Sequence, residues 1–193
     1  MCNKIRLVIV GGGGHGRSSV EAASLSGKFK VVGVLDDTIS PGSFVLETPV
    51  LGPIASRFDF KDCFDEIFVA IGNNFSRENL YRLLVEDGFN FATIIHPTAV
   101  VSPTAKISEG SILMAGSIVS SNVRIGSGAI LNCGAIVDHD CTVDDFGHLG
   151  VNACMAGASS LGRGAWMQAG SALSQGALAP AGTVLLPNAV FLT

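Results

Sequence analysis

The sequence predicts two domains: a Rossmann-like α/β half-domain over residues 1–94 and a parallel β-helix of hexapeptide repeats over residues 95–193. Three observations predict this division. A glycine-rich loop joins a strand to a helix near the start of the chain, and two positions in every six residues keep one chemical character throughout the second half. Charged residues also become rarer, since Asp, Glu, Lys and Arg number 20 in residues 1–94 and eight in residues 95–193. The change falls near Phe91–His96, where Pro97 ends any preceding structure.

The first domain is predicted from a βαβ unit at its start. The β-prone run Ile5–Val10 leads directly into the G-x-G-x-x-G loop of residues 11–16, and a helix is predicted over Arg17–Ser26. A second strand, Lys30–Leu35, ends in Asp36-Asp37, and Asp36 stands where a ribose-binding carboxylate is expected. Glycines let the backbone approach a ligand, and the helix N-terminus offers free amides to it. We also expect the imidazole of His15 to face this crevice.

The rest of the first domain supplies too few elements for a complete dinucleotide fold. Strands are predicted over Glu66–Ile71 and Phe91–Ile95, around a helix over Ser76–Asp87 that Ser76 caps. This amounts to one mononucleotide half, and an NAD site needs two. One nucleotide, or a nucleotide-linked sugar, is therefore a better ligand than NAD. A glycine turn without any ligand and an NAD-dependent enzyme remain as alternatives.

The second domain is predicted from its six-residue period. Every sixth residue from Ile95 to Leu185 is aliphatic or small, and the residue four places after each, from Ala99 to Ala189, is never long, charged or aromatic. Such a period is typical of a parallel β-helix, in which the aliphatic residue fills the coil interior and the small one fits a tight corner. A β-sandwich with chance spacing would not hold two positions fixed over sixteen repeats.

Composition restricts the class of protein further. The 193 residues are 48% hydrophobic and 15% charged with a net charge of −4, which excludes a disordered chain and argues against a nucleic-acid or anionic-membrane partner. No uninterrupted apolar stretch has bilayer length, so we expect a soluble cytoplasmic protein without membrane insertion. The five cysteines are odd in number and lack C-x-x-C spacing, which favours unpaired thiols over a disulfide or zinc framework.

One coil of the predicted β-helix concentrates the groups that can transfer protons. Three hexapeptides make a coil of eighteen residues, so residues eighteen apart are stacked neighbours. The coil of residues 137–154 contains Asp138, His139, Asp140, Asp144, Asp145 and His148. His139 is third in its hexapeptide and points outward, Asp140 can orient its ring, and its stacked neighbour Gly157 exposes a backbone amide. A base beside an amide donor is what acyl transfer needs, because its tetrahedral intermediate carries an oxyanion. His148, stacked under Trp166, is a weaker candidate, since packing explains it nearly as well.

Four features together resemble one bacterial family. They are the glycine-rich loop with an embedded histidine (Gly11–Arg17), the strand end Leu35-Asp36-Asp37, the turn Gly72-Asn73-Asn74, and Asp138-His139-Asp140 within hexapeptide repeats. This combination is similar to the sialic acid O-acetyltransferases and nucleotide-linked amino-sugar N-acetyltransferases of the NeuD/PglD-like family. The resemblance covers nearly the whole chain. It implies that the β-helix is left-handed, whereas the usual crossover rule would predict a right-handed one. It also implies a homotrimer with active sites between neighbouring β-helices.

The resemblance implies a role for each candidate residue. His139 would be the general base that takes a proton from a sugar amine as the amine attacks the acetyl-CoA thioester, Asp140 would orient it, and Gly157 would supply the oxyanion amide. Residues expected to line the acetyl-CoA groove are His148, Gly157 and Ala169. Residues expected to contact the nucleotide-linked sugar are Gly13, His15, Asp36, Asp37 and Asn73. Acetyl-CoA is the co-substrate, and neither a metal nor a nucleic-acid partner is implied.

Two further functions remain open at this stage. O-acetylation of a sialic acid would use the same base, so His139 does not distinguish a hydroxyl acceptor from an amine. The family usually continues past the last coil with a Gly-x-Pro-Ala segment that helps to hold coenzyme A, and residues 185–193 do not match it. This departure motivates the third hypothesis, a nucleotide-binding module that uses its β-helix only to trimerise.

Overall fold

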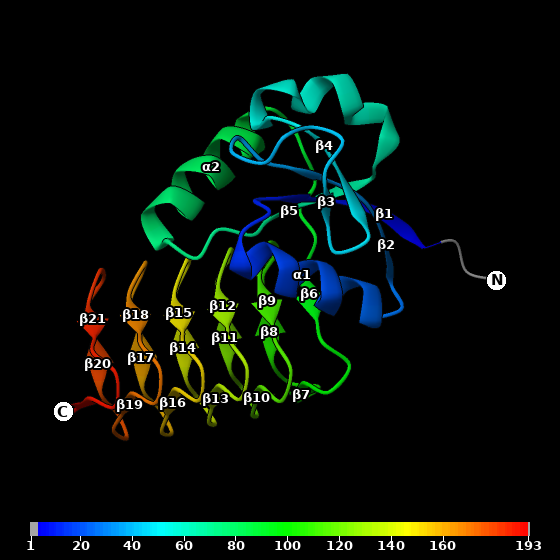
Figure 1. Cartoon of the computed structure of the whole chain (residues 1–193). Helices are drawn as coiled ribbons and strands as arrows, with labels where there is room; N and C mark the ends of the chain where they lie inside the picture. The colour runs from blue at the N-terminus through cyan, green and yellow to red at the C-terminus, as the bar shows by residue number, and fades with distance from the viewer. Residues whose placement is uncertain (1–3, 193) are drawn as a thin grey trace. The chain divides into compact units, whose positions relative to one another are not determined.

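The computed structural model of this protein describes residues 4–192 and divides into two compact units between Ile94 and Ile95. The first unit is a small α/β domain, and the second is a stack of triangular coils (Figure 1).

The first unit is built on one five-stranded sheet with the order β3-β4-β2-β1-β5. Its strands are β1 (Ile5–Val10), β2 (Phe29–Leu35), β3 (Phe44–Val45), β4 (Thr48–Gly52) and β5 (Glu66–Val69). β1 pairs in parallel with β2 and with β5, β2 pairs in parallel with β4, and β3 pairs antiparallel with β4. Because the chain continues on both sides of β1, the carboxyl end of β1 is the topological switch point at which open α/β sheets bind ligands.

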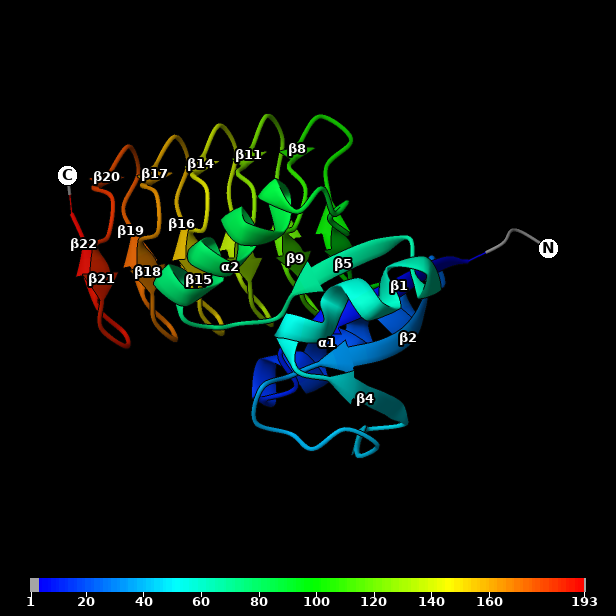
Figure 2. The same ribbon diagram turned by 90° about the horizontal axis from the view of Figure 1, so that it is seen from above.

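Helices connect these strands (Figure 2). They are α1 (Gly14–Leu25), the 3₁₀-helix η1 (Ile54–Cys63) and α2 (Asn74–Glu86). α1 begins three residues earlier than predicted, and a Cβ on Gly16 would overlap the carbonyl oxygen of Gly11, so glycine is required for this tight strand-to-helix turn. The predicted cap of α2 is wrong. The side chain of Asn73 is the cap, and it accepts a hydrogen bond of 2.9 Å from the amide of Ser76.

Several elements of the first unit differ from the prediction. β3, β4 and η1 were not predicted. The predicted strand over Phe91–Ile95 is not continuous, because Phe91 forms only an isolated bridge to Ile67 and the strand β6 (Ile94–Ile95) belongs to a sheet of the second unit. The α/β domain therefore has a mixed sheet with four parallel strands and one antiparallel edge strand.

The second unit is a parallel β-helix with three sheets, each named here by its first and last strands. The β7–β22 sheet contains β7 (Val100–Val101), β10 (Ile118–Val119), β13 (Ile136–Val137), β16 (Cys154–Met155), β19 (Ala172–Leu173) and β22 (Val190–Phe191). The β8–β20 sheet contains β8 (Lys106–Ile107), β11 (Arg124–Ile125), β14 (Thr142–Val143), β17 (Ser160–Leu161) and β20 (Leu178–Ala179). The β6–β21 sheet contains β6, β9 (Ile112–Leu113), β12 (Ile130–Leu131), β15 (His148–Leu149), β18 (Trp166–Met167) and β21 (Val184–Leu185).

Coil register follows the six-residue period. Paired residues are eighteen apart, as in Ile118↔Ile136, so three two-residue strands and three corners complete one coil. The second residue of each strand points inward, and in the middle coils it is fully buried, as are Val119, Ile125 and Leu131. The small residues predicted at the corners are buried as well, for example Ala129 and Ala135. Burying each aliphatic side chain is worth roughly 1.5–3 kcal/mol, so the stack is held together mainly by this single continuous core.

One outer face of the β-helix is apolar along its whole length. The outward residues of the β7–β22 sheet are Val100, Ile118, Ile136, Cys154, Ala172 and Val190. Val100 is 62% exposed and Val190 is 61% exposed. A continuous exposed apolar stripe of this kind is typical of a surface that another protein molecule covers.

Candidate active site

His139 lies at the corner that connects β13 to β14. Its ring Nδ1 is 2.9 Å from Oδ2 of Asp140, and its Nε2 is 3.8 Å from Oδ2 of Asp138, which is beyond hydrogen-bond distance. The His139 side chain is 53% exposed within one chain. The imidazole is thus fixed on its Nδ1 side, while its Nε2 side is turned toward solvent.

Asp140 forms the corner and orients the histidine at the same time. Its φ of 59° is left-handed, a conformation that Asp and Asn adopt more readily than most residues. Oδ1 accepts a hydrogen bond of 2.7 Å from the amide group of Asn122, which occupies the same corner one coil earlier, and Oδ2 faces His139. The hydrogen bond from Asn122, followed by the one from His139, lowers the pKa of Asp140. An ionised carboxylate only accepts hydrogen bonds, so His139 must carry its proton on Nδ1.

This arrangement makes Nε2 of His139 the basic atom of the site. The hydrogen bond to Asp140 raises the pKa of His139 above its ordinary value, and the charge of Asp138 adds to the effect. Neutral His139 therefore presents a lone pair on Nε2 that is a stronger base than that of an isolated imidazole.

Gly157 lies directly against the imidazole, one coil further along the chain. A Cβ at this position would be 2.7 Å from both Cε1 and Nε2 of His139, so only glycine fits beneath the ring. The neighbouring amide of Ala158 is tied to the carbonyl of His139 at 2.9 Å, whereas the Gly157 amide forms no hydrogen bond with any of residues 4–192. Sequence reasoning placed His139, Asp140 and Gly157 together, and the structure brings these three residues to one point.

A second site surrounds the carboxyl end of β1 in the first unit. A pocket of about 340 Å³ opens there. It is lined by Gly11, Gly13, Gly14, His15, Asp36, Asp37, Thr38, Ile54, Ala70, Ile71 and Gly72. No side chain caps α1, whose N-terminal residues belong to this lining. Amides at a helix N-terminus favour an anionic or hydrogen-bonding ligand, as expected of a nucleotide pocket.

The two aspartates of this pocket also brace its walls. Asp36 accepts hydrogen bonds from the amides of Gly12 (2.7 Å) and Ile39 (3.0 Å), and from the amide and hydroxyl of Thr38. Burial alone would raise the pKa of Asp36, but these hydrogen bonds outweigh it and lower that pKa. Asp37 accepts a hydrogen bond of 2.8 Å from the amide of Ile54. Both carboxylates thus fix the loops that form the pocket.

His15 is buried more deeply than the sequence suggested. Its Nε2 is shielded from solvent and has no hydrogen-bond partner among the described residues. Burial and the nearby charge of Arg77 lower the pKa of His15 to about 4, so the ring is neutral at pH 7.

Arg77, which sequence reasoning missed, is the largest fully buried side chain of the described structure. Its guanidinium donates to the carbonyls of Ile71 (3.0 Å) and Gly72 (3.1 Å) and to Oδ1 of Asn74 (2.9 Å). Burial lowers the pKa of Arg77 to about 10. This buried cation holds the loop between β5 and α2 that forms one side of the pocket.

Comparison with known proteins identifies the family. The PglD N-terminal domain family matches residues 6–84. A histidine-to-alanine mutant of GDP-perosamine N-acetyltransferase from Caulobacter crescentus, in complex with CoA and GDP-perosamine, is 32% identical, with a TM-score of 0.84 over 100% of this chain and 95% of that chain. This chain belongs to the NeuD/PglD-like family of acetyltransferases.

Two other relatives agree with this assignment. The acetyltransferase domain of PglB from Neisseria gonorrhoeae FA1090, in complex with acetyl coenzyme A, is 32% identical with a TM-score of 0.76, over 97% of this chain and 94% of that chain. UDP-N-acetylbacillosamine N-acetyltransferase from Bacillus subtilis is 34% identical over 105 residues, which span 53% of this chain and about half (48%) of the relative. The predicted family and the predicted fold, a Rossmann-like half-domain followed by a left-handed β-helix, are confirmed.

Of the three residues expected to line the acetyl-CoA groove, Gly157 lies against His139, but His148 and Ala169 do not lie beside it within one chain of this family member. His148 lies on β15 in the β6–β21 sheet, which is the side of the triangular coil opposite the His139 corner. It is buried and stacked on Trp166, with ring centroids 5.6 Å apart. Ala169 is exposed at the corner between β18 and β19. Asn73, expected to contact the sugar nucleotide, caps α2 and is not among the residues that line the pocket.

Residues 4–192 contain neither a metal-binding cluster nor a helix able to span a membrane. Within that range no group of three or more His, Cys, Asp or Glu side chains is arranged to hold a metal ion. Of the helices in the described part of the chain, none has the length and apolar character needed to cross a membrane.

Proposed function

We propose that this protein transfers the acetyl group of acetyl-CoA to the amino group of a nucleotide-linked amino sugar. The observation that carries the proposal is the corner at which His139, oriented by Asp140, lies directly over Gly157. The relatives support the substrate class, since the Caulobacter enzyme binds CoA with GDP-perosamine and the Neisseria domain binds acetyl-CoA. The pocket at the carboxyl end of β1 supplies a place for the nucleotide.

The chemistry follows from the protonation state of the site. Nε2 of neutral His139 accepts a proton from the sugar amine while the amine nitrogen attacks the thioester carbonyl carbon. The carbonyl oxygen becomes an oxyanion, which the amide of Gly157 stabilises by donating a hydrogen bond. When the intermediate collapses, the carbon–sulfur bond breaks and the imidazolium returns its proton to the departing CoA sulfur. Asp140 stays ionised throughout and stabilises the transient imidazolium.

The distribution of the acetyl-CoA residues favours a homotrimer. The β7–β22 sheet is flanked by two corners, and one carries His139 while the other carries Ala169. If the exposed apolar faces of three copies meet at a common axis, the His139 corner of one copy lies against the Ala169 corner of the next. Such contact would also cover a half-exposed imidazole, which on its own remains in water and cannot provide the dry site that electrostatic catalysis uses.

Replacement of His139 by alanine tests the mechanism. CoA release is measured with acetyl-CoA and a panel of GDP-, UDP- and CDP-linked amino sugars, with free sialic acid as the hydroxyl acceptor. Loss of a general base should lower the rate by about 10²- to 10⁴-fold. The matched control is His96→Ala, since His96 is also outward on the β-helix and bonds Thr98 through Nδ1 at 2.8 Å, but lies outside the His139 coil. Full turnover by His139→Ala with the best acceptor would refute the proposed base.

A further inference from the structure

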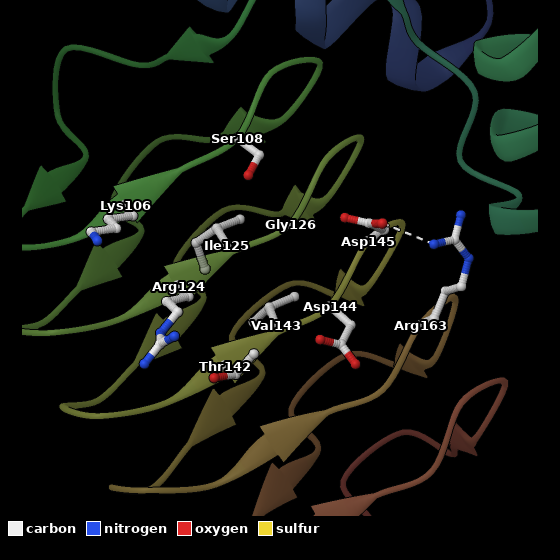
Figure 3. A pocket seen from close by; sticks show the side chains of 10 residues that line it. All are labelled: Lys106, Ser108, Arg124, Ile125, Gly126, Thr142, Val143, Asp144, Asp145 and Arg163. Atoms are coloured by element: carbon white, nitrogen blue, oxygen red, sulfur yellow. Dashed lines mark hydrogen bonds and ion pairs between the residues drawn. The ribbon is translucent and has the colours of Figure 1, made fainter.

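A cavity on the β8–β20 sheet collects all the cations of the β-helix. It has a volume of about 680 Å³ and is open to solvent (Figure 3). Lys and Arg occur only three times in residues 95–193, at Lys106, Arg124 and Arg163, and all three line this one cavity. None of the three has a role in the proposed mechanism.

Two of these cations face each other without a counter-charge of their own. Lys106 and Arg124 are register partners in the neighbouring strands β8 and β11, where opposing Cβ atoms lie about 5 Å apart. Neither side chain forms an ion pair or a hydrogen bond with another residue in the range 4–192. Like charges in opposing positions destabilise a sheet, so this pair costs stability unless an anion lies between them.

The remaining charged side chains of the cavity, which are Arg163, Asp144 and Asp145, carry one net negative charge. Arg163 donates to Oδ2 of Asp145 at 2.8 Å and lies over the ring of Phe146 at 5.1 Å. Asp144 is exposed and forms no ion pair with another residue of the described chain. In Figure 3 Lys106 and Arg124 lie on one side of the cavity, and the Asp145–Arg163 pair lies on the other. The Lys106–Arg124 side therefore carries the net positive charge.

The Lys106–Arg124 side of the cavity is next to the coil that contains His139. Thr142 on β14 follows His139 by three residues and also lines the cavity. Arg124 and Lys106 stand one and two coils from Thr142 in the same sheet, and neighbouring strands are about 4.8 Å apart. An anion held by these two side chains is therefore close enough to belong to a molecule that reacts at His139.

We propose that Lys106 and Arg124 form a phosphate-binding site that holds a phosphate group of one of the two substrates beside the catalytic coil. Both substrates of the proposed reaction, acetyl-CoA and the nucleotide-linked sugar, carry phosphates. The proposal therefore rests on the proposed function, which supplies these two sources of the bound phosphate. The guanidinium of Arg124 offers a planar fork that matches a phosphate, Lys106 adds a mobile point charge, and the Thr142 hydroxyl can donate a further hydrogen bond. A bound phosphate also removes the repulsion between the two cations.

The test is equilibrium binding to the full chain, without turnover. Dissociation constants are measured for CoA, dephospho-CoA, GDP and UDP with the wild type, Lys106→Gln, Arg124→Gln and the double variant. Loss of a single charge-assisted hydrogen bond to phosphate weakens binding by about tenfold, so the double variant should bind the relevant ligand at least about tenfold more weakly. Asp144→Asn should have the opposite effect and tighten binding. Arg163→Gln, which removes a cation from the same cavity but not from the Lys106–Arg124 side, is the matched control and should weaken binding less than Arg124→Gln.

The four ligands together show which phosphate group the site binds. Weakened CoA binding with unchanged dephospho-CoA binding assigns the site to the 3′-phosphate, and weakening of both assigns it to the pyrophosphate of CoA. Weakened GDP or UDP binding alone assigns it to the nucleotide-linked sugar. Unchanged affinity for all four ligands in the double variant overturns the proposal. Because no turnover is needed, this result is independent of the His139→Ala assay, and either proposal can fail without the other.

Discussion

Gly157→Ala should inactivate the protein while leaving it folded. The new Cβ would lie 2.7 Å from Cε1 and Nε2 of His139, whereas carbon atoms pack best at about 3.5–4.0 Å. The ring must therefore retreat by about 1 Å, and a displacement of that size can lower a rate by about 10²-fold. Retreat costs little stability, because the imidazole is half-exposed and Gly157 does not have a left-handed φ. We expect a stability loss of about 1 kcal/mol or less.

The assay pairs kcat/KM for acetyl transfer with the free energy of unfolding in urea. Adding Gly157→Ala to His139→Ala should cause no further loss of rate, since the ring that the methyl group displaces is already gone. Gly162→Ala is the contrasting variant: its Cβ would meet the backbone of Pro180 and Ala181, which cannot rotate away, so it should lower stability instead. Wild-type kcat/KM in Gly157→Ala would refute the placement of the reacting atoms over this glycine.

Three further predictions concern ionised and buried groups. Asp140→Asn replaces the carboxylate that most raises the pKa of His139 by a neutral amide, so the acid limb of the kcat/KM–pH profile should move to lower pH while the plateau falls; an unmoved limb would contradict the assignment. His15 has a folded-state pKa of about 4, below its unfolded value near 6.5, so its neutral form stabilises the fold above pH 6.5 and this contribution is lost as the pH falls toward 4. Urea unfolding at pH 7 and pH 4.5 should show His15→Asn losing about 2.5 kcal/mol less than the wild type over this interval. Arg77→Met removes the guanidinium that donates to two backbone carbonyls and to the Asn74 side-chain oxygen. The substitution should lower the free energy of unfolding by about 2 kcal/mol or more and weaken nucleotide binding. Unchanged stability would show that burying the charge costs as much as its hydrogen bonds contribute.

The β-helix was predictable because its geometry repeats. Each coil must fill the same interior and turn the same corners, so one rule applies to sixteen hexapeptides and chance agreement is averaged out. The same rule gives the stacking of residues eighteen apart, which is how His139 and Gly157 were placed together before the structure was known. The same period also implies the contact between Asn122 and Asp140, because these residues are eighteen apart.

The first unit was harder to predict because its elements are short and do not repeat. β3 has two residues, β4 contains Pro49, and the ten residues of η1 contribute no buried side chain, so none of them leaves a clear hydrophobic period. Asn73 shows a second difficulty, since the residue types that cap helices are also those that bind ligands. Arg77 occupies the buried face of α2 with Tyr81 and Leu84, at spacings of four and seven residues, so the helical period contained its position but not its contacts.

The His139 corner shows how so regular a scaffold can hold an exposed imidazole. Each corner from Gly110 to Asn188 contains one residue with a left-handed backbone, and along this edge the successive residues are Asn122, Asp140, Ala158 and Gly176. Asn and Asp tolerate that backbone and also bear side chains that hydrogen-bond along the stack, so the corner that turns the chain can hold an imidazole as well. In the next coil the imidazole of His139 needs space, and the space is open because Gly157 has no side chain. The reaction geometry therefore needs no departure from the six-residue period, because it is obtained by choosing which permitted residue occupies each corner.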